Sequence, residues 1–154
     1  MRRLAILAAA GAVLFGGAGW LLLPGMAGNR TDPVQAGRVA DGRALYAEHC
    51  AACHGADLSG APDWQTPGAD GKPGAPPHDA TGHTWHHGDA LLFDYVKNGG
   101  QVALRRRGVD YDSGMPGFGD ALSDAQIEDI LAFIRSTWTD EIRAFQAQRT
   151  REEG

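Results

Sequence analysis

The feature that most constrains this chain is a closely spaced pair of cysteines, Cys50 and Cys53, followed at once by a long segment rich in glycine and proline. The chain has 154 residues and no other cysteine, so no disulfide framework can hold it together. A loop as long as residues 55–82 needs a function or an object to wrap. The sequence therefore predicts a small fold that is stabilised by more than its own apolar side chains. The prolines that exclude regular structure from this loop are Pro62, Pro67, Pro73, Pro76 and Pro77.

Helical periodicity dominates outside this loop, and no segment shows the alternation of a strand. A first helix is expected over 34–49, and it leads directly into the cysteine pair. A shorter helix is expected over 89–97, where the run Asn98-Gly99-Gly100 supplies a stop signal. The stretch from there to the turn Gly114-Met115-Pro116-Gly117 is expected to be irregular. The residues that share one face of the first helix are Val39, Gly42, Leu45 and Tyr46.

The last helix has the clearest start signal. Ser123 is a good N-cap, Gln126 occupies the capping-box position, and Asp124 favours the helix dipole. Residues 139–154 are expected to continue as a polar, exposed helical tail. The fold class is therefore all-α. The apolar stripe of the last helix consists of Ile127, Ile130, Leu131, Ile134 and Trp138.

The N-terminus predicts export. Arg2 and Arg3 precede 20 residues, Leu4 to Leu23, without a charged or polar side chain, and a helix of that length spans a bilayer core. We expect residues 1–24 to be an uncleaved membrane anchor, with a cleaved signal segment as the alternative. Residues 25–33 would be a linker. By the positive-inside rule the domain that follows lies outside the cytoplasm, in the periplasm if the membrane is a bacterial inner membrane.

The exported part is acidic. From residue 30 onward the chain has 19 acidic residues against 12 basic ones, a formal difference of −7. This balance argues against a nucleic-acid partner, which requires a basic surface. It fits a partner protein with a positive patch, or it serves only solubility.

The motif Cys50-Ala51-Ala52-Cys53-His54 has the CxxCH spacing of covalent haem attachment. Each thiol can add to one vinyl group of the same porphyrin, and the adjacent His54 can then bind the iron. Two alternatives use the same residues. A structural zinc site needs further ligands, and a redox dithiol needs a βαβ setting that the sequence does not show.

With this motif, the helix that carries Gly42 and Tyr46, and the late Met115-Pro116 pair, residues 34–138 resemble the class I cytochrome c family. The resemblance implies a mono-haem domain whose first and last helices cross near Gly42. It also implies that Met115 binds the iron opposite His54, although a loop methionine can instead simply fill a gap. The apolar shell over the porphyrin would include Trp64, Trp85, Leu104 and Phe118.

The segment from Gly82 to Asp89 contains His83, His86 and His87, and resembles one found in a subgroup of bacterial membrane-anchored cytochromes c. These histidines are candidates for a second metal such as copper. They could instead hydrogen-bond a haem propionate or cap the next helix. A further alternative is that His86 or His87 replaces Met115 on the iron.

Together these features predict an electron carrier with one covalent haem c, held in the membrane near a respiratory or oxidase complex. The alternatives are a haem enzyme or sensor in which Met115 dissociates, and a copper-handling module built on the three histidines. The run Arg105-Arg106-Arg107 is expected to be a solvated face, or to pair with propionates or a partner.

Overall fold

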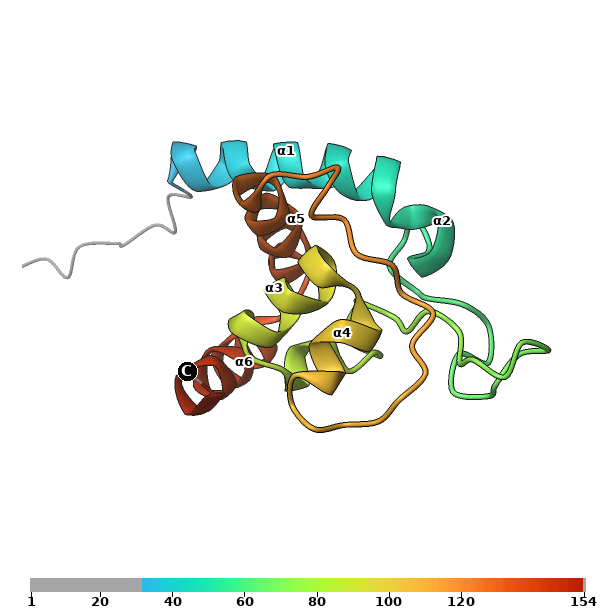
Figure 1. Ribbon diagram of the computed structural model, residues 1–154. Helices are drawn as coiled ribbons and strands as arrows, with labels where there is room; N and C mark the ends of the chain where they lie inside the picture. Colours follow the sequence, from blue (N-terminus) through green and yellow to red (C-terminus); the bar gives the residue numbers. More distant parts are fainter. Residues whose placement is uncertain (1–31, 154) are drawn as a thin grey trace, which may run out of the picture. The chain divides into compact units, whose positions relative to one another are not determined.

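The computed structural model describes residues 32–153, and within that range it contains helices and no strand (Figure 1). The predicted all-α class is confirmed. Residues 55–83 form no helix, as their proline content predicts; one isolated bridge joins Pro67 and Pro73. In chain order the helices are α1 (Pro33–His49), α2 (Ala51–His54), the 3-10 turn η1 (Thr84–His86), α3 (Asp89–Asn98), α4 (Gly100–Arg105), α5 (Asp124–Ser136) and α6 (Asp140–Glu153).

The expected anchor, residues 1–24, and most of the expected linker lie outside the described residues. Among the residues that are described, no helix has the length and apolar character needed to cross a membrane. The first helix starts slightly earlier than expected. Asp32 is its N-cap and accepts a hydrogen bond from the backbone N–H of Val34, with Pro33 in the first turn.

Helices α1 and α5 cross at Gly42, as the family resemblance implies (Figure 1). A methyl group added at Gly42 would lie 1.8 Å from the backbone oxygen of Asp129, so the two helices touch through their main chains here. Beside the crossing, Arg38 Nε pairs with Asp129 Oδ1 at 2.7 Å. One turn along α1, the Tyr46 ring packs against Phe133 with centroids 5.4 Å apart.

The capping box of α5 forms as predicted, since the Ser123 hydroxyl accepts from the Gln126 N–H and the Gln126 side chain accepts from the Ser123 N–H. The apolar stripe of this helix is the centre of the core. Partly buried side chains from α1, the loops and α6 pack around it, Val39, Leu45, Met115 and Phe118 among them. The fully enclosed core residues include Tyr46, Ile127 and Ile130.

The region after α3 differs from the prediction, because the chain turns at Gly99 and begins a new short helix, α4, at Gly100. The segment that returns toward α5 then runs along the end of α3. The backbone N–H groups of Phe118 and Gly119 donate to the carbonyls of Val96 and Lys97, both at 2.9 Å. These bonds satisfy carbonyls that the end of a helix leaves without intrahelical partners.

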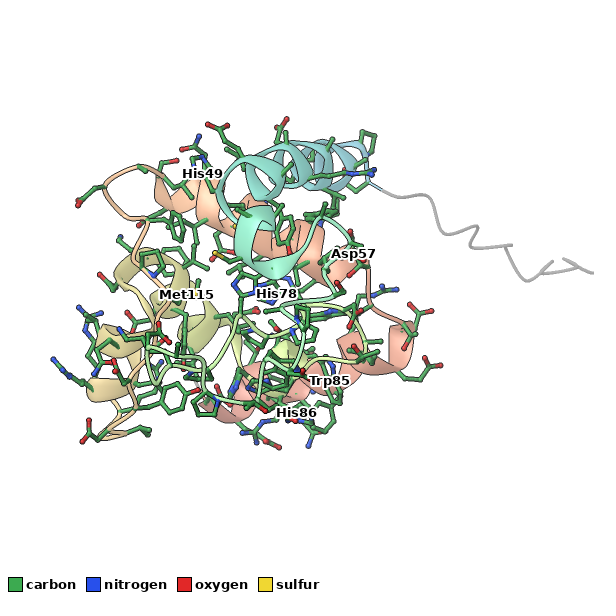
Figure 2. The ribbon with its side chains drawn as sticks, turned by 90° about the vertical axis from the view of Figure 1, so that its right-hand side faces the viewer. His49, Asp57, His78, Trp85, His86 and Met115 are labelled. Atoms are coloured by element: carbon green, nitrogen blue, oxygen red, sulfur yellow. The ribbon has the colours of Figure 1, made fainter. Side chains whose placement is uncertain are left out.

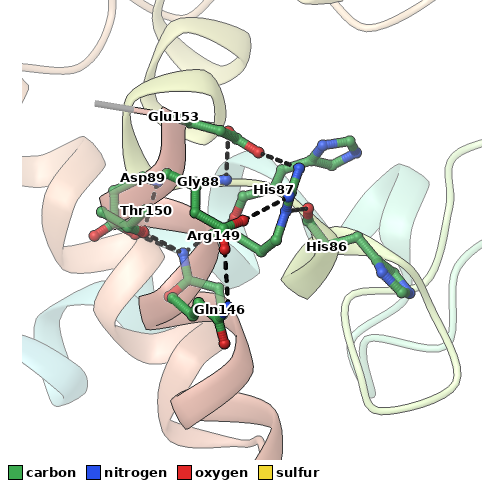
Figure 3. Close-up of polar contacts among 10 residues, drawn as sticks. His86, His87, Gly88, Asp89, Gln146, Arg149, Thr150 and Glu153 are labelled. Carbon is green, nitrogen blue, oxygen red and sulfur yellow. Dashed lines mark hydrogen bonds and ion pairs between the residues drawn. The ribbon is translucent and has the colours of Figure 1, made fainter.

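The C-terminal residues also differ from the expected extension of the last helix. Helix α5 ends at Ser136, Trp138 is buried beyond it, and α6 is a separate helix. One side of α6 packs against the segment that enters α3 (Figure 3). Glu153 Oε2 accepts from the Gly88 N–H at 2.8 Å, and Thr150 Oγ1 accepts from the Asp89 N–H at 3.1 Å. Since Gly88 has no side chain to cap α3, α6 supplies acceptors that the local sequence lacks.

Candidate haem site

The cysteine pair lies where α1 ends and the single turn of α2 begins. The Cys50 N–H donates to the Tyr46 carbonyl and closes the last turn of α1. The Tyr46 hydroxyl in turn donates to the Gly55 carbonyl at 3.0 Å, which ties the end of α2 back to α1. The short helix therefore presents Cys50, Cys53 and His54 within little more than one turn, and the position of that turn is set by a fully buried tyrosine.

The surroundings of Cys50 differ from those of a reactive thiol. Burial, together with the nearby Cys53, raises the pKa of Cys50 to about 11. A reactive dithiol needs the opposite shift, since the thiolate is the nucleophile. The zinc alternative also lacks support: in residues 32–153 no group of three or more His, Cys, Asp or Glu side chains is placed to hold a metal ion. Of the alternatives for this motif, haem attachment fits the geometry best.

His54 is prepared to act as a metal ligand. Its side chain is buried, and its Nδ1 lies 2.8 Å from the carbonyl oxygen of Pro76. Since that carbonyl can only accept, Nδ1 carries the proton and Nε2 is left with a free lone pair. Burial lowers the pKa of His54, and the hydrogen bond to Pro76 opposes this effect only in part. The lowered pKa favours the neutral ring, which is the form that binds metals.

Met115 comes from the segment between α4 and α5 and packs against the same core cluster as Cys50 and Ala51. In Figure 2 it lies on that returning segment, to the left of the labelled His78. The Met115 carbonyl accepts from the Gly100 N–H at 3.1 Å, so its backbone is fixed to the start of α4. The ring of Phe118, three residues on, contacts His49 with centroids 6.2 Å apart. This places the methionine segment beside the end of α1 that leads into the cysteine pair.

His78, which no sequence motif singles out, also belongs to this site. Its ring stacks on His54 with centroids 4.0 Å apart and planes 21° apart. Burial, reinforced by His54 and His83, lowers the pKa of His78 to about 3. Pro76 was likewise missed, because it acts through its main-chain carbonyl and no side-chain pattern marks it. The sequence motif includes neither Pro76 nor His78, and both reach His54 only because the loop folds back on it.

The histidines of residues 83–87 are placed differently from one another. His83 stacks on Trp64 with centroids 5.4 Å apart, and His86 stacks on Trp85 at 3.8 Å. His87 contacts the edge of the His83 ring at 5.2 Å. Within the described chain they form no three-ligand group, and neither His86 nor His87 has a ring contact or hydrogen bond with His54 or Met115. The second metal, and a histidine in place of Met115, stay predictions from the sequence.

The expected apolar shell is present in part. Trp85 and Phe118 pack against the core, Leu104 is half-buried on α4, and Trp64 covers His83. The Trp85 indole N–H is buried and has no hydrogen-bond partner among the described residues. An orphaned buried donor is costly unless a further acceptor occupies the space beside it. The acidic propionates of a haem are acceptors of the required kind, so the residues present fit this group.

The arginine run is largely engaged within the domain. Arg106 and Arg107 both pair with Asp94 on α3, the latter with Nη1 3.1 Å from Oδ2. Arg107 also donates to the Ala103 carbonyl at 3.2 Å. Two of the three charges therefore link α3 to the end of α4, while all three arginines stay exposed to solvent, as the sequence predicts.

A helical domain with a CxxCH turn, a buried histidine that leaves Nε2 free, and a distant loop methionine defines a c-type cytochrome. A family model described as cytochrome c matches residues 39–138. That match covers more than half of the chain, and the protein belongs to the cytochrome c family. Membership implies a haem c. The helix α6 lies beyond the matched range.

Among curated proteins the chain is similar to the cbb3-type cytochrome c oxidase subunit CcoP of Azospirillum sp. (strain B510). The two are 36% identical over 101 residues, which are 66% of this chain and 29% of the relative. The chain thus matches less than a third of that subunit. No solved structure matches it.

Proposed function

We propose that this chain is an electron carrier that holds one covalent haem c, and that it is not itself an enzyme. The observation that carries the proposal is the hydrogen bond from His54 Nδ1 to the Pro76 carbonyl at 2.8 Å. It leaves Nε2 of His54 free to bind a metal, and His54 directly follows the second cysteine of the motif. A bound haem supplies a one-electron couple between ferrous and ferric iron.

The side chains have distinct roles in this proposal. Cys50 and Cys53 form the two thioether bonds, which keep the group in place in both oxidation states. His54 and Met115 would hold the iron, and the surrounding core, with Trp85 and Phe118 packed on it, would keep water away from it. A thioether ligand and a dry shell both favour the reduced state and raise the reduction potential. With the iron held by these two side chains, no position would remain for oxygen or a substrate.

Covalent attachment is tested by extracting the denatured protein with acidic organic solvent. We expect the pigment to stay with the polypeptide and to give the pyridine haemochrome spectrum of a haem with two saturated side chains. The variant with Cys50→Ala and Cys53→Ala together should lose covalent pigment. Release of the pigment from the unaltered protein would contradict the proposal.

The role of Met115 is tested by its replacement with alanine. The reduced wild-type protein should bind carbon monoxide poorly, and reduced Met115→Ala should bind it readily, since one axial position is then open. The oxidised wild-type spectrum should also show a sulfur-to-iron charge-transfer band that the variant lacks. Ready binding of carbon monoxide by the wild type would favour a ligand-binding enzyme or sensor instead.

We further propose that residues 1–24 hold the domain on the exported side of a bacterial inner membrane, where it exchanges electrons with a respiratory complex. The support is the uncharged stretch Leu4–Leu23 after Arg2 and Arg3, together with the similarity to an oxidase subunit. Anchoring raises the effective concentration of a membrane partner. Membrane fractionation of the full chain, and of a chain lacking residues 4–23, tests this: only the latter should be released by washing.

A further inference from the structure

The contact between His78 and His54 is the most specific feature of the site that the function proposed above does not use. The two imidazoles lie nearly parallel, with centroids 4.0 Å apart and planes 21° apart. His54 ends α2, whereas His78 lies in the long loop that follows it. The edge of the Tyr46 ring contacts His78 at 6.1 Å. His78 is therefore held between the iron-ligand candidate and the most buried aromatic side chain of α1.

The ring of His78 is fixed in rotation as well as in position. Its Nδ1 lies 2.8 Å from the hydroxyl oxygen of Thr84, and that hydroxyl donates to the Pro77 carbonyl at 3.3 Å. The hydroxyl carries one hydrogen, so both contacts are satisfied when Nδ1–H of His78 donates to Thr84. An aliphatic side chain could fill the same space, but it could not be oriented by this hydroxyl.

The backbone around His78 is tied to distant parts of the fold. The His78 N–H donates to the Leu58 carbonyl at 2.8 Å, and the His78 carbonyl accepts from Trp138 Nε1 at 2.7 Å. Pro76, two residues earlier, accepts the Nδ1–H of His54. One short stretch of loop thus contacts His54 twice, at its edge through a carbonyl and at its face through an imidazole.

We propose that His78, oriented by Thr84, is a positioning residue that fixes the plane of the His54 imidazole toward the iron. The proposal rests on the function proposed above. Groups that hold a ligating histidine in a chosen orientation tune both its geometry and the properties of the metal. The hydrogen bond to Pro76 fixes one atom of the His54 ring. The stacked ring of His78 restrains the remaining rotation of the His54 ring about that atom.

The test uses the haem-loaded protein and four variants. His78→Leu removes the stacked ring, Thr84→Val removes only the anchoring hydroxyl, and Thr84→Ser restores it. Thr81→Val is the matched control, because the Thr81 hydroxyl donates to Asp79 Oδ1 and forms no hydrogen bond with the His78 side chain. The readouts are the g values of the ferric protein by electron paramagnetic resonance, which report the orientation of the axial imidazole, and the midpoint potential.

We expect changed g values and a shifted midpoint potential in His78→Leu and Thr84→Val, and wild-type values in Thr84→Ser and Thr81→Val. If His78→Leu does not incorporate haem, Thr84→Val decides, because it keeps the size and shape of the side chain. Wild-type g values and potential in haem-loaded Thr84→Val would overturn this inference and leave the proposed function intact. Absence of covalent haem from the wild type would overturn both.

Discussion

Gly60 shows at the scale of one residue how the long loop supports the site. It has a φ of +73°, and a methyl group built on it would lie 2.5 Å from the nitrogen of Pro77 and 2.7 Å from the carbonyl carbon of Pro76. The loop therefore crosses itself closely at the residue whose carbonyl holds His54. No side chain is accommodated there without moving that carbonyl.

We expect Gly60→Ala to lower the free energy of unfolding by about 3 kcal/mol or more, through backbone strain and the clash together. Gly71→Ala is the matched control, since Gly71 has a similar φ of +78° but nothing within 4 Å of the added methyl. It should cost only about 1 kcal/mol. Denaturant unfolding of the haem-loaded proteins measures both values. Equal losses would show that the close approach to Pro76 does not matter.

A second prediction at the scale of one residue concerns Asp94 and the effect of pH on stability. Burial raises the pKa of its carboxyl, but hydrogen bonds from Asn98 and Arg107 and the charge of Arg106 outweigh burial and hold the pKa below its usual value. A carboxyl with a lowered pKa in the folded state stabilises the protein above its unfolded pKa of about 4, and that contribution is lost as pH falls below it.

Asp94→Asn should therefore lower the free energy of unfolding by about 1 kcal/mol at neutral pH, and by less near pH 3. Asp110→Asn serves as the control, because Asp110 is exposed and no ion pair joins it to another described residue. Urea unfolding at the two pH values tests the prediction. A penalty that does not shrink on acidification would mean that packing, and not charge, gives Asp94 its effect.

At the scale of elements, the crossing of α1 and α5 depends on one glycine. Gly42→Ala places a methyl group 1.8 Å from the Asp129 oxygen, so the helices must separate. We expect a loss of about 3 kcal/mol or more in the free energy of unfolding. Gly37→Ala lies in the same helix with nothing within 4 Å of the new methyl. It should stabilise the protein by about 0.5–1 kcal/mol, as alanine does in place of an exposed helical glycine.

Circular dichroism during chemical unfolding compares the two glycine variants directly. If both substitutions changed the free energy of unfolding in the same direction, the close crossing at Gly42 would be contradicted. The pair also separates the tertiary contact from helix propensity, since both replacements raise the helix propensity of α1 equally.

The elements that sequence reasoning identified are those with strong local signals. The face of α1 and the capped, striped α5 follow from periodicity and from the Ser123–Gln126 pair, and both are confirmed. Helix α4 was missed because the signal that ends α3 is followed at once by a new start at Gly100, and six residues carry too little periodicity to be recognised.

In the candidate site, too, the part with a local sequence signal could be predicted and the part that depends on the folded loop could not. The order of residues within Cys50-Ala51-Ala52-Cys53-His54 is sufficient to predict the attachment motif, because covalent attachment to one porphyrin constrains that spacing. The contacts of Pro76 and His78 with His54 could not be predicted, since they depend on how the loop folds back over α2. A main-chain acceptor has no sequence signature.

At the scale of the whole molecule, α6 extends the domain beyond the residues that the family model covers. Its sequence is polar enough to be taken for an exposed tail, yet Gln146 is only 3% exposed. The Gln146 amide donates to the His87 carbonyl at 3.2 Å and to Asp89 Oδ1 at 2.9 Å (Figure 3). Arg135 of α5 pairs with the same Asp89 oxygen at 2.7 Å. Asp89 thus joins the start of α3 to both C-terminal helices.

Replacing Gln146 by alanine leaves the His87 carbonyl without this donor inside the packed interface. We expect a loss of about 1–3 kcal/mol in the free energy of unfolding, which is the cost of leaving a buried polar group unpaired. Gln148→Ala removes a glutamine of the same helix whose amide bonds only the exposed Glu152, and it should change stability by less than about 0.5 kcal/mol. Urea unfolding of the two haem-loaded variants distinguishes an integral α6 from a tail, because a tail would make both substitutions equally harmless.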